Sequence, residues 1–267
     1  MIVIKIGGGP DINHRAVFEN LRRLLDTGEQ AIVVHGANHA MAEVSAQLGH
    51  QPRFIRSASG HESRYTDAEA MEIFQMVYCG KINKSLVALC HCLGINAVGL
   101  SGIDGRLLFG RRKQALRVVE DGRCRIVRDD LSGRVETVNV ELLKLLLDGG
   151  YVPLICPPAL SEENQAINVD GDRAAAMIAI AMKARRLVIL SDVPGLLRDP
   201  GDEATLVPQI PMVSIDEYEK FAQGRMKKKV LGAAEALARG VSAVILADGR
   251  SSHPLDEALE GRGTLLF

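Results

Sequence analysis

Aromatic residues are scarce in this sequence, and tryptophan is absent. They make up 4% of the 267 residues. Proteins that bind single-stranded nucleic acid stack bases on aromatic side chains, so this composition argues against that class. The formal net charge is −1, without the excess of cations that nucleic-acid binding requires. No window approaches the unbroken apolar run of a membrane-spanning helix, so we expect neither a nucleic-acid partner nor a membrane segment.

Cysteine is present in small, odd number and without a regular spacing. The five cysteines are Cys79, Cys90, Cys92, Cys124 and Cys156. Such a set does not indicate a disulfide framework and is typical of reduced thiols in the cytoplasm. The Cys-His-Cys run at 90–92 lies in an apolar helical stretch, where a lone pair of thiols is weak ground for zinc, so we predict no metal site. The chain opens on a strand at Ile2 without a signal peptide, which also favours a cytoplasmic location.

Strand-like and helix-like segments alternate along the chain. Strands are expected at 2–6, 31–34, 97–100, 151–156 and in the stretches RLVILS and AVILA. Helices are expected from Asn13 to Asp26, from 37 to 48, from Asp67 to about Cys79, in a separate helix from there to about Cys92, and from 139, 170 and 225. This alternation predicts an α/β fold with a mainly parallel sheet.

The chain divides into two predicted lobes near residue 183. The first, residues 1–183, contains an insertion at about 106–138 whose short alternating runs and Asp-Gly turn signal at 121–122 predict an antiparallel hairpin. Further hairpins are expected at 51–67 and 159–168. The second lobe, residues 184–267, begins with a strand and a loop.

The first strand carries a lysine and ends in three glycines. Lys5 lies inside an otherwise apolar strand, followed by Gly7, Gly8 and Gly9. A buried ammonium group requires an anion beside it, and glycines let the backbone approach a ligand closely. The pattern is neither the standard P-loop nor the dinucleotide fingerprint. It predicts the start of a phosphate site.

Three more stretches place polar residues where helices begin. His35, Gly36 and Ala37 end a strand, and their backbone N–H groups could hold an anion or simply form a tight turn. Asn168, Asp170 and Asp172 open an apolar helix; capping explains one of these acids but not the whole spacing. The run Arg225-Met-Lys-Lys-Lys229 opens the last long helix, where cations are unfavourable unless an anion is bound.

Together with the stretch Leu-Ser-Asp-Val-Pro-Gly at 190–195, these motifs resemble the amino acid kinase family over essentially the whole chain. The resemblance is closest to the acetylglutamate kinase branch. Within that branch, the stretches EIFQMVYCGKINK, GLSGIDGRLLFGRRK and RMKKKVLGAAEA are similar to the kinases that act on 2-aminoadipate, or glutamate in relatives, attached by its amino group to a small acidic carrier protein. The resemblance implies a three-layer αβα fold of the carbamate kinase type and an ATP-dependent, cytoplasmic enzyme of lysine or arginine biosynthesis that makes an acyl phosphate.

The resemblance also implies roles for individual residues. Lys5 and Lys229 would neutralise the transferring phosphoryl group, Asp172 would hold both lysines, and Gly8 would donate a backbone N–H. The implied substrate-binding residues are Gly36, Ala37, Arg64 and Asn168. The implied nucleotide-binding residues are Gly7, Ser191, Asp192, Gly195 and Lys227. Mg²⁺ would arrive with ATP rather than bind a protein site. Ala37 departs from the glycine common in the branch, and Asp170 from the asparagine of many acetylglutamate kinases.

The insertion is strongly basic. Residues 106–128 hold eight lysines and arginines against two acidic residues, and a second cluster lies near 50–56. An acidic carrier would gain association rate from such a patch, although a solvated charged hairpin is the simpler explanation. The predicted carrier-docking residues are Arg53, Arg56, Arg111, Arg112 and Lys113.

Several alternatives stay open at this point. One is an N-acetylglutamate kinase of arginine biosynthesis, which would act on a free acylated amino acid. Another is a uridylate or isopentenyl phosphate kinase, against which Arg64 and Asn168 argue. A third is a non-catalytic amino-acid sensor, against which the intact Lys5, Asp172 and Lys229 argue. With the first strand at Ile2, the resemblance implies a homodimer rather than an arginine-inhibited hexamer.

Overall fold

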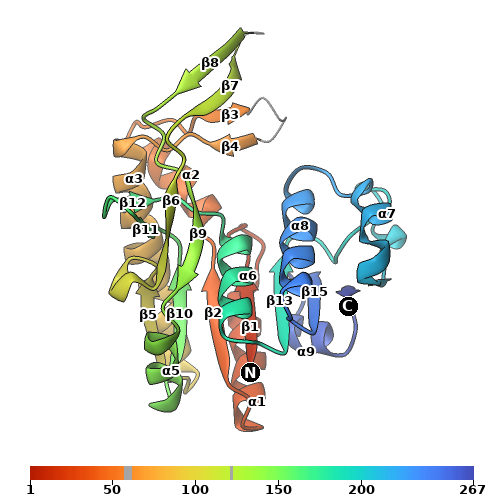
Figure 1. The fold of residues 1–267 in the computed structure, drawn as a ribbon. Coiled ribbons are helices and arrows are strands. Elements are labelled where there is room, and N and C mark those ends of the chain that lie inside the picture. Colours follow the sequence, from red (N-terminus) through yellow and green to blue (C-terminus); the bar gives the residue numbers. More distant parts are fainter. Residues whose placement is uncertain (57–61, 121–122) are drawn as a thin grey trace.

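The structure is a computed structural model that describes residues 1–56, 62–120 and 123–267. Within this part, eight strands form one sheet in the order β14-β16-β15-β13-β1-β2-β10-β5 (Figure 1). Their bounds are β1 (Ile2–Ile6), β2 (Ala31–His35), β5 (Ala97–Ser101), β10 (Val152–Cys156), β13 (Arg186–Ser191), β14 (Gln209–Ile210), β15 (Ala243–Asp248) and β16 (Thr264–Leu266). The strands from β15 to β5 are parallel, and β16 runs antiparallel to β15. The predicted mainly parallel sheet is confirmed.

Helices cover both faces of this sheet. They are α1 (His14–Asp26), α2 (Asn38–Gln47), α3 (Ala68–Gln75), α4 (Asn83–Cys92), α5 (Val140–Asp148), α6 (Gly171–Ala181), α7 (Ile215–Glu219), α8 (Gly224–Ala238) and α9 (Pro254–Leu259). Shorter turns are the 3₁₀ segments η2 (Asp104–Arg106), η3 (Glu203–Thr205) and η4 (Met212–Ser214). No helix of the described residues combines the length and the apolar character that a membrane crossing demands.

Side chains of β1 alternate between two apolar cores, one on each face of the sheet. Ile2, Ile4 and Ile6 pack with α1, α4 and α9, whereas Val3 packs with α5, α6 and α8. The fold is therefore three-layered, as the resemblance implies. Lys5 shares the face of Val3, so its ammonium group lies on the side of α6 and α8.

The residues that precede several helices explain where those helices begin. The side chains of Asn13, Asp67, Asn139 and Asp170 each accept a hydrogen bond from a backbone N–H group of the first turn. The predicted starts at these residues are confirmed, because an N-cap satisfies donors that have no partner inside the helix.

The predicted break between two helices near Cys79 is wrong. The chain stays helical from Ala68 to Cys92, since the π-helix η1 (Met76–Ile82) connects α3 to α4. The wider turn of a π-helix admits an extra residue without ending the helix, and such segments often occur at functional sites.

The insertion is antiparallel, as predicted, but it consists of two strand pairs where a single hairpin was expected. The strand β6 (Leu108–Arg112) pairs with β9 (Gly133–Val138), and β7 (Leu116–Glu120) pairs with β8 (Arg123–Val127). The Asp-Gly turn at 121–122 lies outside the described residues. A parallel pairing of β6 with β11 (Ala159–Ser161), which itself pairs with β12 (Ala166–Ile167), joins the insertion to the predicted 159–168 hairpin.

A second ribbon, β3 (Phe54–Arg56) with β4 (Glu62–Arg64), lies beside β7 and β8 at the top of Figure 1. Ile55, Tyr65 and Val118 form a small apolar core between the two ribbons. The two basic segments of the sequence are thus parts of one projecting unit.

Candidate functional site

Two lysines from different layers hold one carboxylate at the carboxyl end of the sheet. The Lys5 ammonium nitrogen lies 2.6 Å from Asp172 Oδ1, and the Lys229 ammonium nitrogen lies 2.8 Å from Asp172 Oδ2. Lys5 comes from β1, Asp172 from the first turn of α6 and Lys229 from α8. Each residue is only 7% exposed. Predicted neighbours far apart in sequence are therefore brought together in one buried cluster.

The charges in this cluster stabilise one another. Burial opposes the charge on Lys5, but the attraction of Asp172 outweighs it and raises the Lys5 pKa. Burial would raise the pKa of Asp172, but the two ammonium groups lower it well below the usual range. Burial and the repulsion of Lys5 lower the pKa of Lys229. One carboxylate facing two cations leaves a net positive charge, which favours an incoming anion.

The local sequence explains where Asp172 points. Asp170 caps α6 by accepting hydrogen bonds of 3.0 Å from the backbone N–H groups of Asp172 and Arg173. A side chain added at Gly171 would stand 3.7 Å from the Lys5 side chain. The cap therefore fixes the first turn of α6 above Lys5. In this structure Asp170 caps the helix, and Asp172 pairs with the charged lysines.

The glycines after β1 contact the loop after β2. A Cβ atom at Gly8 would fall 2.4 Å from the Ala37 nitrogen and 2.5 Å from the Asn38 nitrogen. The Gly8 carbonyl accepts a 2.9 Å hydrogen bond from the His39 N–H, and the Gly36 N–H donates one of 2.9 Å to Ile6. Only glycine permits this approach, so two of the predicted anion-binding stretches form one backbone surface.

Asn168, one of the predicted substrate-binding residues, is held by groups far from it in sequence. Its amide donates a 2.9 Å hydrogen bond to the Thr66 hydroxyl, and the Thr66 N–H donates to Asp130 at 2.9 Å. The Arg64 guanidinium lies 5.3 Å from the centre of the Phe54 ring. Burial lowers the pKa of Arg64, and the nearby Arg225 lowers it further. This arginine therefore lies where an additional carboxylate would relieve repulsion between cations.

Tyr78 was not predicted from the sequence, yet it lies at this site. Its hydroxyl donates a 2.8 Å hydrogen bond to Asn38 Oδ1, and its ring stacks on Phe74 with 4.0 Å between ring centres. Burial raises the Tyr78 pKa to about 12, so the hydroxyl keeps its proton at neutral pH. The π-helix η1 supplies this tyrosine, and no sequence signal that we used identifies π-helices.

Four of the five predicted nucleotide-binding residues lie at or shortly after the ends of β1 and β13, whereas Lys227 lies in α8. The Gly7 N–H donates a 2.9 Å hydrogen bond to the Leu190 carbonyl, and a Cβ at Gly9 would lie 3.8 Å from Asp192. Ser191 is buried, whereas Asp192 and Lys227 are exposed. Gly195 is buried, and a Cβ there would fall 2.5 Å from the Thr264 hydroxyl. These positions stay predictions for nucleotide binding.

His35 is the buried histidine beside the site. It is fully buried and contacts the Asn83 amide at 3.1 Å. Burial lowers its pKa to about 4, so it is neutral at pH 7. Within the described residues, no group of three or more His, Cys, Asp or Glu side chains could hold a metal ion.

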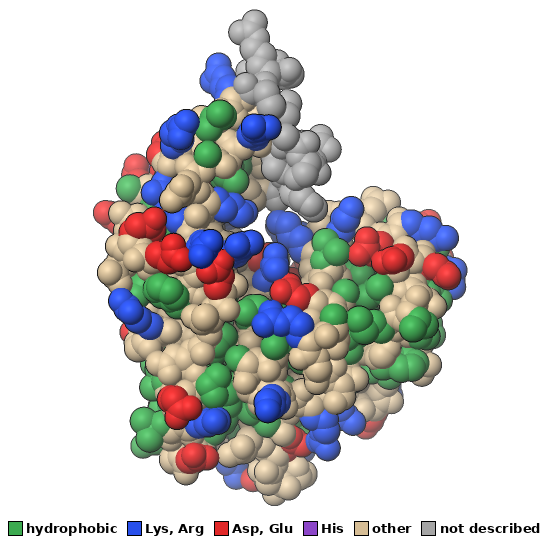
Figure 2. Space-filling view, in the orientation of Figure 1, with side chains coloured by type: hydrophobic (Ala, Val, Ile, Leu, Met, Phe, Trp, Pro, Cys, Tyr) green, Lys and Arg blue, Asp and Glu red, His purple; other side chains and the backbone are tan. Residues whose placement is uncertain are grey.

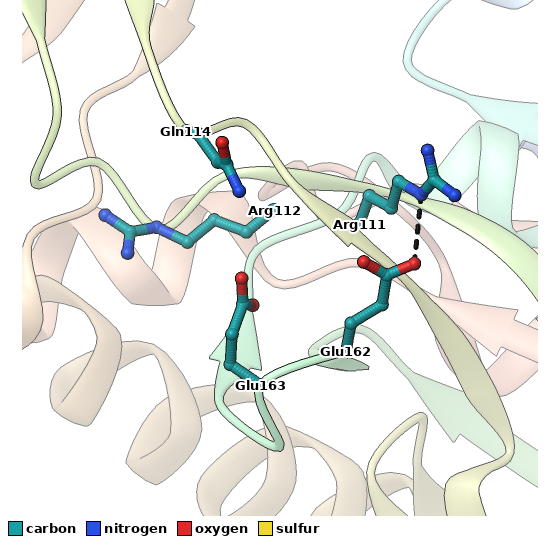
Figure 3. Close-up of a pocket in the computed structure, with 5 residues that line it drawn as sticks. All are labelled: Arg111, Arg112, Gln114, Glu162 and Glu163. Carbon is teal, nitrogen blue, oxygen red and sulfur yellow. Dashed lines mark hydrogen bonds and ion pairs between the residues drawn. The ribbon is translucent and has the colours of Figure 1, made fainter.

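The predicted docking residues differ in their surroundings. Arg111 lies within 3.3 Å of Glu136 and 3.0 Å of Glu162. The Arg112 side chain points away from β6 in a different direction from Arg111 (Figure 3), and its guanidinium donates a 3.0 Å hydrogen bond to the Asp130 carbonyl. Both line a pocket of about 350 Å³ together with Gln114, Glu162 and Glu163. Two of the predicted docking cations therefore already have partners within the chain.

Lys113 faces other cations instead. It is exposed, and burial of part of the side chain, Lys228 and Arg173 lower its pKa although Asp130 opposes them. Figure 2 shows lysines and arginines gathered around the hollow between the β7–β8 ribbon and α8. Arg53 lies over the Tyr65 ring at 4.8 Å, and the Arg56 side chain lies outside the described part of the chain. We call this region the cationic hollow. Its Lys113 lies near Arg173 and Lys228, the chain neighbours of Asp172 and Lys229, so the hollow faces the site.

Fold and site together define an α/β protein with two buried lysines around one carboxylate at the carboxyl end of its sheet. A family model described as the amino acid kinase family matches residues 1–248, and the chain belongs to that family and is a kinase. Proteins named [LysW]-aminoadipate kinase from Deinococcus radiodurans and Thermus thermophilus are 52% and 50% identical over 266 and 268 residues, covering 100% of this chain and 91% and 100% of theirs. A protein of Methanopyrus kandleri named acetylglutamate kinase is 38% identical over the full length of both chains.

Two solved structures have the same fold at low identity. N-acetylglutamate synthase from Neisseria gonorrhoeae is 23% identical with a TM-score of 0.80, over 99% of this chain and 58% of that one. Carbamate kinase from Giardia is 18% identical with a TM-score of 0.68, over 100% of this chain and 98% of that one. The predicted carbamate kinase type of fold is confirmed.

Proposed function

We propose that this chain transfers the γ-phosphoryl group of ATP to the side-chain carboxylate of 2-aminoadipate linked by its amino group to a small acidic carrier protein. The product is an acyl phosphate for amino-acid biosynthesis. The observation that carries the chemistry is the buried pair of lysines on Asp172. Full-length identity of 50% or more to two proteins named [LysW]-aminoadipate kinase supports the substrate.

The arrangement of charges explains how such a reaction proceeds. A side-chain carboxylate has a reference pKa of about 4.3 and is ionised at neutral pH, so the nucleophile needs no general base. This agrees with a neutral, buried His35. The obstacle is repulsion between an anion and a polyanion. Lys5 and Lys229 offset this repulsion, and their charge stabilises the transferring group more as it moves between donor and acceptor oxygens.

Asp172 acts on the lysines rather than on the substrate. By pairing with both ammonium groups, it keeps them on the two sides of the transferring group and prevents them from repelling each other. Charged groups that are already in place need not reorganise during the reaction, which is the main source of such catalysis. The Gly8 N–H would add a backbone donor.

Further roles follow for the residues around this centre. Arg64 would pair with the α-carboxylate of the substrate, since a guanidinium binds a carboxylate through two parallel hydrogen bonds. Gly36, Ala37 and Asn168 would contact its reacting end. Gly7, Ser191, Asp192, Gly195 and Lys227 would line the nucleotide site, in a second lobe of residues 184–267. Mg²⁺ would come bound to the ATP phosphates, since the carboxylate in contact with the lysines, Asp172, already pairs with both ammonium groups.

The cationic hollow would receive the carrier. Lys113, together with Arg53 and Arg56, would attract an acidic protein and raise its association rate. Arg111 and Arg112 would contribute less, because Glu136, Glu162 and backbone carbonyls already bind them. We further propose a cytoplasmic homodimer, from the resemblance and the composition.

Trapping of the acyl phosphate with hydroxylamine tests the proposal. The enzyme is incubated with ATP, Mg²⁺ and one of four acceptors: aminoadipate or glutamate linked to the carrier, or their free N-acetyl forms. We expect ATP-dependent hydroxamate mainly with carrier-linked aminoadipate. Hydroxamate mainly with free N-acetylglutamate would make the chain an acetylglutamate kinase, and ligand binding without hydroxamate on any acceptor would identify an amino-acid sensor.

A further inference from the structure

Two cysteines that the proposed reaction does not use lie in contact next to the site. Cys79 belongs to η1 and Cys156 is the last residue of β10, 77 positions further along the chain. Their sulfur atoms are 3.8 Å apart. Cys156 is buried, whereas Cys79 is partly exposed. A reagent can thus reach one thiol, and the second stands behind it.

Neighbouring groups make the two thiols unequal. The hydrogen bond from Cys156 lowers the pKa of Cys79, and Ser101 and Lys84 act in the same direction. The contact with Cys79 and burial raise the pKa of Cys156. Lys84 is held in place by hydrogen bonds to Asn83 and the Gly99 carbonyl. Since the thiolate is the reactive form, Cys79 is the thiol that reacts first.

We propose that Cys79 and Cys156 form a reversible disulfide with peroxide as the oxidant. The Cys79 thiolate attacks hydrogen peroxide, an S–O bond forms as the O–O bond breaks, and the departing hydroxide takes up a proton to become water. The Cys156 sulfur then attacks the Cys79 sulfenic acid, giving the S–S bond and a second water as the thiol proton leaves with the hydroxyl group. In total, two electrons pass from the thiols to peroxide.

The bond requires movement of η1. A disulfide is about 2.0 Å long, so the two sulfur atoms must approach by nearly half of their 3.8 Å separation. Cys156 is fixed at the end of β10, which is paired on both sides, with β2 and β5, so η1 is the element that shifts. Tyr78 precedes Cys79 and donates to Asn38 beside Ala37. The disulfide would therefore displace the loop at residues 36–38, which we call the substrate loop. Its effect on the reaction rests on the proposed function, whereas formation of the disulfide does not.

Peptide mapping tests the disulfide directly. The full-length protein is treated with hydrogen peroxide at neutral pH, free thiols are alkylated with iodoacetamide, and the tryptic peptides are weighed. We expect a cross-linked pair containing Cys79 and Cys156, two hydrogen masses lighter than the separate reduced peptides and absent after dithiothreitol. Cys79→Ser abolishes it, and Cys92→Ser, which removes an exposed thiol from α4, leaves it intact. The peptide map of the wild-type protein tests the disulfide even if a cysteine variant folds poorly.

Two results would overturn the proposal. One is oxidation of Cys79 to sulfinic acid while Cys156 stays alkylatable; the other is a cross-link that pairs Cys79 with a different cysteine. Activity on the carrier-linked acceptor should fall about 10-fold or more on oxidation and return on reduction. A disulfide with unchanged activity refutes only the effect on the substrate loop, and a reduced enzyme without activity refutes only the proposed function.

Discussion

Asp172 compensates two buried cations that would otherwise repel each other. With 7% of each residue exposed, none of the three charges is well solvated. Removing one partner of a buried ion pair is costly because the remaining charge has neither water nor counter-ion. The lysine inside the first strand, which is unfavourable in isolation, is thereby explained by a residue 167 positions away in the sequence.

Replacing Asp172 with Asn should destabilise the protein. We expect Asp172→Asn to lower the free energy of unfolding by about 3–5 kcal/mol at pH 7, measured by urea denaturation. The matched control is Asp170→Asn, which removes a neighbouring exposed charge and keeps a good N-cap. Equal stability losses in both variants would contradict the role of Asp172 as the shared counter-ion.

The difference in unfolding free energy between wild type and Asp172→Asn has a defined pH dependence. The folded-state pKa of Asp172 is lowered, so its stabilising contribution is complete above the unfolded-state pKa of about 3.9 and is lost as the pH falls toward the folded-state value. The stability difference between wild type and Asp172→Asn should therefore be constant from about pH 5 to 8 and shrink below about pH 4.

Lys229 should matter for turnover more than for binding. We expect Lys229→Ala to lower kcat by about 10²–10³-fold with a small change in the Kd for ATP, because its charge acts mostly on the transferring group. The matched control is Lys227→Ala, an exposed lysine two positions earlier, which should change ATP binding more than kcat. An unchanged kcat in Lys229→Ala would refute its assigned role.

At the scale of elements, the contact between the loops after β1 and β2 sets the geometry of the site. Gly8→Ala would place a methyl group 2.4–2.5 Å from two backbone nitrogens, and rigid backbone must then shift. We expect a fall in kcat/KM of about 100-fold, as for a misplacement of about 1 Å. Gly9→Ala is the control, since its added methyl meets Asp192 at an ordinary 3.8 Å. Similar activity in both variants would refute the close-contact argument.

Local sequence signals predicted those elements that local physics determines. Capping residues such as Asn13 and Asp67 fix helix starts through bonds within a single turn, and the alternation of β1 predicts its two-sided burial. The π-helix η1 was missed because no local sequence signal marks it, although in the folded chain its Tyr78 stacks on Phe74 and donates a hydrogen bond to Asn38. The pairing of β6 with β11 was missed because residues about 50 positions apart meet only in the folded chain.

The residues of the site also divide into those that the sequence could predict and those that it could not. Lys5 and Lys229 were noticed because cations in an apolar strand or at a helix start are unfavourable, whereas the role of Asp172 came from the family resemblance. Thr66, Tyr78 and Asp130 carry no such signal, since each is an ordinary residue until its partner is known. The partners of Arg111 were equally invisible: Glu136 and Glu162 lie outside the segment whose charge was counted.

At the scale of the whole molecule, lysines and arginines gather around the hollow as well as on the projecting ribbons (Figure 2). We expect Lys113→Glu to raise KM for a carrier-linked substrate about 10-fold while sparing the N-acetyl substrate, because attraction to an acidic partner becomes repulsion. Lys144→Glu makes the same charge change on α5 as a control. Equal effects of Lys113→Glu on both substrates would instead place Lys113 in the nucleotide site.

The most direct test of the account is the ratio of kcat/KM for carrier-linked aminoadipate to that for free N-acetylaminoadipate, measured on the wild-type enzyme at two salt concentrations. The account predicts a ratio of about 10² or more at low salt that falls as salt rises, because exposed charges are screened beyond about 8 Å at 0.15 M. A ratio near one at both salt concentrations would contradict carrier recognition and leave a kinase of free acylated amino acids.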